Sequence, residues 1–102
     1  MRNELNSIII EGTLITDAAE CESPDGAPVC SFTIANERFY RRPSGIEKEV
    51  YFFEIEAHLG LAEAMKKRKR VRVAGRLKQA GSEGRTVIAA DHIEFRPDLK
   101  EK

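Results

Sequence analysis

The sequence predicts an all-β domain with five strands and one short helix. Most apolar stretches are short, and they are either β-branched or alternate with polar residues, as strands with one buried face do. Clusters of Gly, Pro, Asp and Ser separate these stretches. A chain of 102 residues has room for one modest core and is too short for two domains. We therefore expect a single domain over residues 1–96, followed by a short polar end at 97–102.

The first two strands are expected at 7–16 and 28–36. The first, SIIIEGTLIT, is apolar and β-branched, and its interior Gly12 is typical of a bulge or a sharp bend. The turn chemistry of 22–28, ESPDGAP, separates the two strands. Alternation along the second strand predicts one apolar face, made of Cys30, Phe32 and Ile34.

The chain from 28 to 59 is expected to form a β-hairpin whose tip is ERFYRRPSGIEK, with the turn at 42–48 and the return strand at 49–59. Alternation along the return strand predicts a core face of Tyr51, Phe53, Ile55, Ala57 and Leu59. Phe52 falls on the other, polar face. An unbroken register would place Phe39 on that same outer face and Tyr40 on the opposite one.

The second half of the chain is expected to hold a helix and two strands. GLAEAMKK (60–67) has good helix formers, with two apolar residues one turn apart. Strands are expected at 70–77 and 86–95, joined by a tight connection at 79–85. This chain order is that of an OB-fold, a small Greek-key barrel whose open face takes oligonucleotides or oligosaccharides. Other small barrels fit the pattern as well.

Charge is distributed unevenly within a net charge of zero. Residues 1–30 hold one base against six acids, whereas residues 66–78, KKRKRVRVAGRLK, hold eight bases and no acid. Such asymmetry is typical of a surface that meets a polyanion, although a single basic run can also be a solvated face.

Targeting and redox features are few. No apolar run approaches membrane-spanning length, and the N-terminus lacks the pattern of a signal peptide, so we expect a cytoplasmic protein. Cys21 and Cys30 have no C-x-x-C spacing, and we expect two reduced thiols, with Cys30 in the core, and no metal.

An enzyme is the competing class of function. His58 and His92 lie far apart in the sequence, and no nucleophile, zinc or phosphate-loop motif is present. We therefore expect no catalytic residue and no cofactor.

The stretch NERFYRRPSG, residues 36–45, places two aromatics among three arginines. Binding of single strands needs aromatic rings on which bases stack and cations that track the backbone. Phe39 with Arg38, Arg41 and Arg42 would supply both. The alternative is a solvated loop with an aromatic side chain tucked beneath it. Glu54 and Glu56 argue against a groove near Phe52, because they share its face and would repel phosphate.

Five segments of the sequence together resemble the bacterial single-stranded DNA-binding protein family. These segments are LNSIIIEGTLITDAAE, SPDGAPVCSFTIANERF, FFEIEAHLGLAE, KRKRVRVAGRLK and AADHIEF, in that order and with similar spacing. The resemblance covers nearly the whole chain. It implies an OB-fold, homo-oligomers (dimers or tetramers), and sequence-independent binding of single-stranded DNA in replication, repair and recombination.

The resemblance also implies roles for particular residues. Phe39 and Phe52 fall at base-stacking positions, and His58 falls at a third aromatic position. Lys67, Arg72 and Arg76 fall on or beside the basic strand. The expected nucleic-acid-binding residues are therefore Arg38, Phe39, Arg41, Arg42, Phe52, His58, Lys67, Arg72 and Arg76.

Two departures from the family pattern bear on function. The connection at 79–85 has no aromatic residue, and the chain stops at Lys102 without the acidic tip that recruits replication and repair enzymes in this family. We therefore do not expect such recruitment. An alternative function is a tail-less accessory or primosomal-type OB-fold module that interacts with proteins and binds DNA weakly. Binding of oligonucleotides by the purified chain alone would distinguish the two.

Overall fold

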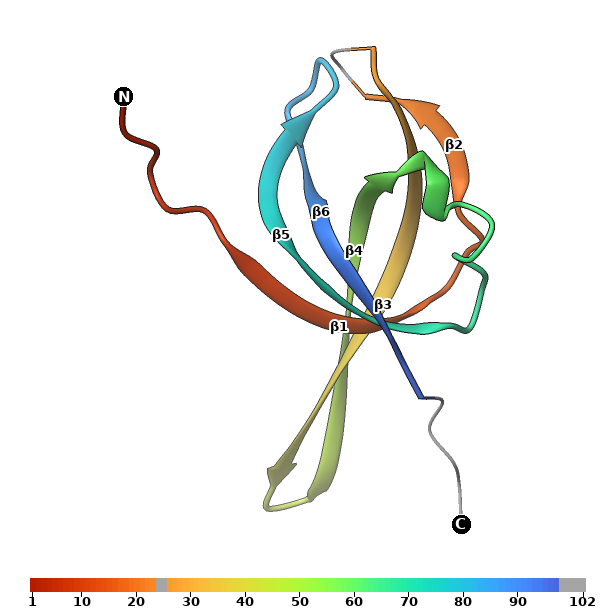
Figure 1. The fold of residues 1–102 in the computed structure, drawn as a ribbon. Coiled ribbons are helices and arrows are strands. Elements are labelled where there is room, and N and C mark those ends of the chain that lie inside the picture. Colours follow the sequence, from red (N-terminus) through yellow and green to blue (C-terminus); the bar gives the residue numbers. More distant parts are fainter. Residues whose placement is uncertain (24–25, 98–102) are drawn as a thin grey trace.

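The computed structural model describes residues 1–23 and 26–97, which form one twisted sheet (Figure 1). Its strands are β1 (Ile8–Leu14), β2 (Ala19–Glu22), β3 (Pro28–Arg42), β4 (Gly45–His58), β5 (Arg70–Ala80) and β6 (Arg85–Arg96). The all-β class is confirmed, and each of the five predicted strands is present. Apart from Pro97, the expected polar end lies outside the described residues, as does part of the turn expected at 22–28.

Five of the strands close into a ring. They pair in the order β1-β5-β6-β4-β3, and β1 pairs again with β3 at Thr13↔Ala35 and Leu14↔Ile34. The β4–β6 pair is parallel, and the other pairs are antiparallel. β2 was not predicted. It is a short, fully exposed edge strand beside the start of β3, and it therefore lacks the alternation that marks a half-buried strand.

The core fills the inside of this ring. Its buried side chains include Leu14, Cys30, Phe32, Ile34, Ile55, Ala57, Met65, Val71, Val73 and Ile88. Gly12 allows β1 to approach β3, since a Cβ there would lie 2.8 Å from the carbonyl oxygen of Ala35. Cys30 is fully buried, as predicted.

The prediction of an α-helix over 60–67 is wrong. The segment forms only a 3-10 helix, η1 (Leu59–Leu61), followed by turns. A helix of about two turns must be held by tertiary contacts, because nucleation costs more than so few hydrogen bonds return. Here five consecutive bases begin at Lys66, and Arg68 takes a positive φ of 80°. Met65 is still fully buried, so the segment contributes to the core without a helix. Within the described residues no helix is long and apolar enough to cross a membrane.

The strands of the β3–β4 hairpin extend further toward its tip than the sequence predicts, because the turn expected over 42–48 is reduced to Pro43 and Ser44. Its far half projects beyond the barrel as an arm (Figure 1). Tyr51 and Phe53, expected on the core face, are therefore 42% and 36% exposed. Only Ile55 and Ala57 from that face are buried in the core, because alternation predicts which residues share a face and not where the barrel ends.

Candidate nucleic-acid interface

Phe39 and Phe52 stand on one face of the arm, which we call the outer face. The β3–β4 register runs without a bulge from Val29↔His58 to Arg42↔Gly45 and pairs Ala35 with Phe52. Directly paired residues point to the same side, and Phe39 is four residues along the strand from Ala35. The two rings are thus about 13 Å apart along the arm. They are 64% and 60% exposed, so neither is part of the core.

Cations flank Phe39 on this outer face. Lys48 is paired with Phe39 across the hairpin, and Arg41 lies two residues further along β3. Lys48 makes an ion pair of 3.0 Å with Glu37, also on this face. Arg41 is exposed and has no ion pair among the described residues. The outer face therefore combines exposed rings with a guanidinium that forms no ion pair within 1–23 and 26–97.

Two of the predicted arginines lie on the opposite face of the arm, around Tyr40. The guanidinium carbons of Arg38 and Arg42 lie 5.4 and 4.9 Å from the centre of the Tyr40 ring. Each arginine also pairs with a carboxylate at 3.3 Å, Arg38 with Glu49 and Arg42 with Glu47. The stretch NERFYRRPSG is thus divided between two faces, and Tyr40 packs between guanidinium groups as part of neither the core nor the outer face.

An arginine cluster adjoins the base of the arm. A pocket of about 190 Å³ there is lined by Phe39 and Arg70, among others. Arg72 pairs with Glu11 at 2.7 Å, and Arg96 pairs with the same carboxylate at 3.4 Å. The hydrogen bond from Arg72, aided by the charges of Arg96 and Arg70, lowers the pKa of Glu11. Three cations therefore surround one anion.

Sequence reasoning identified only Arg72 in this cluster. Arg70 could have been found by alternation, since it lies two residues before Arg72 on the same strand face. Arg96 could not, because it joins the cluster only through the pairing of β5 with β6, which sets Arg70 opposite Arg96.

His58 and Arg76 are brought together at the barrel end of β4. Both line a pocket of about 280 Å³, together with Lys78 and Asp91. Arg76 pairs with Asp91 at 2.9 Å. His58 has a structural task as well, because its Nδ1 accepts a hydrogen bond of 3.0 Å from the Gly60 amide and caps η1. His58 lies on the same side of β4 as Phe52, because the two are six residues apart, and it is about 20 Å further along the strand.

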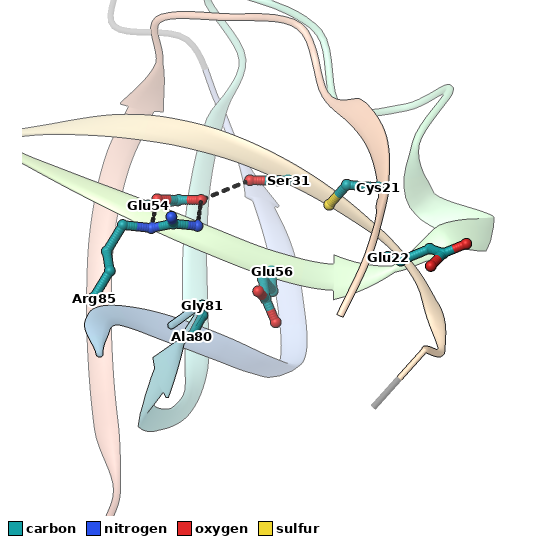
Figure 2. Close-up of a pocket in the computed structure, with 8 residues that line it drawn as sticks. All are labelled: Cys21, Glu22, Ser31, Glu54, Glu56, Ala80, Gly81 and Arg85. Carbon is teal, nitrogen blue, oxygen red and sulfur yellow. Dashed lines mark hydrogen bonds and ion pairs between the residues drawn. The ribbon is translucent and has the colours of Figure 1, made fainter. Parts of the chain in front are cut away.

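The two glutamates between Phe52 and His58 are both paired with cations, and Figure 2 shows the pair between Glu54 and Arg85. Glu54 receives both Nε and Nη2 of Arg85, at 2.9 and 3.1 Å, and a hydrogen bond of 3.2 Å from the Ser31 hydroxyl. Glu56 is only 7% exposed, and its Oε1 lies 2.7 Å from Nζ of Lys78. The carboxylates expected to repel phosphate are therefore neutralised by cations that the sequence analysis did not assign.

Lys67 lies apart from these residues, in the loop that follows η1. The loop is held beside the end of β1, where the Arg68 amide donates to the Leu14 carbonyl at 2.8 Å. The Lys67 amide donates to Asp17 at 2.7 Å. The side chains of Lys66, Lys67 and Lys69 are exposed and form no ion pair with the described residues.

The cysteines take no part in these surfaces as a pair. Both are free, and Cys21 is exposed at the pocket beside Glu54. Burial raises the pKa of the Cys30 thiol, which suits an inert core residue. Residues 1–23 and 26–97 contain no cluster of three or more His, Cys, Asp and Glu residues able to hold a metal ion.

Known proteins are similar to this chain in sequence and in fold. Residues 5–95 match the single-strand binding protein family model. A single-stranded DNA-binding protein of Mycobacterium tuberculosis is 37% identical over 92% of this chain, and one of Aquifex aeolicus is 36% identical over 74%. The chain spans 65% and 54% of the lengths of these relatives.

Solved structures support the same fold at low sequence identity. One is described as a Plasmodium falciparum SSB complex with ssDNA; it has a TM-score of 0.72 at 18% identity and covers 95% of this chain and 99% of its own. A Thermus aquaticus single-stranded DNA-binding protein also has a TM-score of 0.72 at 18% identity, covering 91% of this chain and 51% of its own. The expected OB-fold is thus confirmed, and the chain belongs to the single-strand binding protein family.

Proposed function

We propose that this chain binds single-stranded DNA without regard to sequence. The observation that carries the proposal is the pair of exposed rings, Phe39 and Phe52, on one face of an unbroken hairpin. Every base has a π-face, so stacking on such rings tolerates any sequence. Membership of the single-strand binding protein family supports the same conclusion.

Cations near the rings would hold the backbone of the strand. Arg41 on the outer face has no ion-pair partner in the part of the chain that the structure describes, and the cluster of Arg70, Arg72 and Arg96 exceeds the charge of Glu11 by two. Arginine suits this task, because its planar guanidinium can pair with phosphate and also stack on a base. Arg76, beside His58, extends the cationic surface along the barrel.

The remaining predicted residues form a second group in this proposal. Arg38 and Arg42 would contact a strand that wraps around the arm, because they lie on its other face. Lys67 would contact it only where the path reaches the loop after η1. The outer-face residues should therefore dominate the affinity, and this second group should contribute less.

We also infer the setting in which this binding takes place. The chain would act as one OB-fold domain over residues 1–96, without catalysis, in DNA replication, repair and recombination. In bacteria such as those of its relatives, it would act in the cytoplasm. It would assemble as a homo-oligomer, for which the edge of β1 at Ile8–Ile10, unpaired on the side away from β5 in the described residues, is a suitable surface.

A titration of labelled oligonucleotides tests the proposal. Poly-dT and mixed-sequence strands of equal length should bind with similar affinity, and binding should weaken as salt rises. Duplex DNA of the same length is the control, since its stacked bases cannot reach the two rings. Equal affinity for duplex and single strands, or no binding of single strands at low salt, would contradict the proposal.

A further inference from the structure

The face that carries Phe52 is interrupted by an ion-pair network before it reaches His58. Alternation along β4 places Phe52, Glu54, Glu56 and His58 on one side, and the two glutamates lie in the middle. They line a pocket of about 360 Å³ together with Ser31 and Arg85 (Figure 2). A strand that stacks on Phe52 and continues toward His58 would have to cross this pocket.

The two carboxylate oxygens of Glu54 contact Arg85 in the way that two oxygens of a phosphate would. Both Nε and Nη2 of Arg85 engage the carboxylate, at 2.9 and 3.1 Å, in the two-point geometry that guanidinium also adopts with phosphate. The side chain of Arg85 is 57% exposed, whereas that of Glu54 is 30% exposed and is fixed by Ser31. The arginine is therefore the partner that can turn away.

The neighbouring ion pair, between Glu56 and Lys78, behaves differently because its carboxylate is buried. The side chain of Glu56 is 8% exposed and that of Lys78 is 30% exposed. Separating them would leave a buried carboxylate without a cation, which is strongly unfavourable. This pair is therefore expected to stay closed when Arg85 moves.

Resting on the proposed function, we propose that Glu54 is a resident competitor of phosphate and that Arg85 is a further DNA-binding residue. Without DNA, Glu54 holds Arg85 at the tip of the β5–β6 hairpin. A strand crossing the pocket exchanges that contact for one between Arg85 and its own phosphate. The carboxylate keeps the hydrogen bond from Ser31.

Glu54→Gln is the direct test. The amide nearly preserves the shape and removes the charge, so Arg85 is free before DNA arrives. Affinity for poly-dT should rise about 2- to 5-fold at low salt, the amount by which an exposed ion pair can compete. The log–log salt slope should steepen by about 0.7, because one more phosphate is neutralised without a competing carboxylate.

Glu83→Gln is the matched control. Glu83 lies in the turn of the same hairpin, is exposed, and forms no ion pair with the described residues. Glu83→Gln therefore removes one negative charge from the same hairpin, as Glu54→Gln does from its neighbour, without freeing a cation. An equal gain in affinity from Glu83→Gln would show a general charge effect and would overturn the proposal.

A second pair of variants separates exchange from a merely structural contact. Arg85→Gln should weaken binding, since it removes the cation and leaves the Glu54 charge on the path. Adding Glu54→Gln to Arg85→Gln should recover part of that loss, but it should not restore the steeper salt slope. A slope that steepens equally without Arg85 would contradict its role.

The outcomes distinguish this inference from the proposed function. If the unaltered chain does not bind single strands, the proposed function fails and the exchange falls with it. If the chain binds, thermal melts are unchanged, and Glu54→Gln alters neither affinity nor slope, only the exchange is refuted.

Discussion

Truncating the two exposed rings should weaken DNA binding much more than it weakens the fold. Phe39→Ala and Phe52→Ala each remove one stacking platform, and base–aromatic stacking is worth about 1–3 kcal/mol by truncation. That range corresponds to a loss of affinity of about 5- to 150-fold. The rings are 64% and 60% exposed, so the loss of stability should stay far below the ~3–5 kcal/mol typical of a buried Phe.

The assay is a fluorescence titration with labelled poly-dT beside a thermal melt for each variant. Phe32→Ala is the buried control at 2% exposure and should lose stability in the full range for a core Phe. Tyr40→Ala should cost some stability through its two cation–π contacts, with little direct effect on binding. The reasoning is refuted if the two Phe variants unfold while affinity per folded subunit is unchanged.

Three further effects follow from the contacts described above. Arg72 lowers the pKa of Glu11 in the folded protein below its ordinary value of 4.5. The stability that this gives is therefore present above pH 4.5 and is lost as the pH falls through the folded pKa. In thermal melts from pH 7 to 3, Glu11→Gln should lose less stability on acidification than the unaltered chain. Gly75→Ala should destabilise by about 1–3 kcal/mol, because a Cβ there would clash with the Ala89 carbonyl oxygen, and an unchanged melting temperature would contradict this. Lys78→Met should cost about 1–3 kcal/mol in denaturant unfolding, since it leaves a carboxylate oxygen buried without its cation, and a neutral result would mean that water reaches the site.

Local patterns predicted the strands and the two faces of the hairpin well. Period-2 alternation depends only on the backbone, so it correctly placed Phe39 with Phe52 and set Tyr40 opposite. The same pattern could not say that Tyr51 and Phe53 lie beyond the barrel, because the end of a barrel is set by which strands pair. Good helix formers did not make a helix of 60–67, where nucleation outweighs propensity.

The ion pairs were beyond sequence reasoning for a related reason. Glu54 and Arg85 are 31 residues apart, and Glu11 and Arg72 are 61 apart. Each pair forms because strands distant in the sequence lie side by side with a particular register. The objection that Glu54 would repel phosphate was sound for an isolated charge, and it is answered only by the closure of the ring that brings Arg85 beside it.

Salt dependence should follow the unpaired cations rather than the number of bases. When an arginine leaves a carboxylate for a phosphate, the carboxylate recruits a cation from solution, which offsets the counterion that the phosphate releases. Arg76, paired one-to-one with Asp91 at 2.9 Å, should thus contribute to affinity with little effect on the log–log slope. Lys67, unpaired among the described residues, should contribute about −0.7 where it reaches a phosphate.

Arg76→Gln and Lys67→Gln remove the same charge and should therefore separate in a titration at several salt concentrations. Arg76→Gln should lower affinity while the slope is retained, and Lys67→Gln should flatten the slope. A slope that flattens with Arg76→Gln as much as with Lys67→Gln would mean that the surface ion pairs are already open in solution.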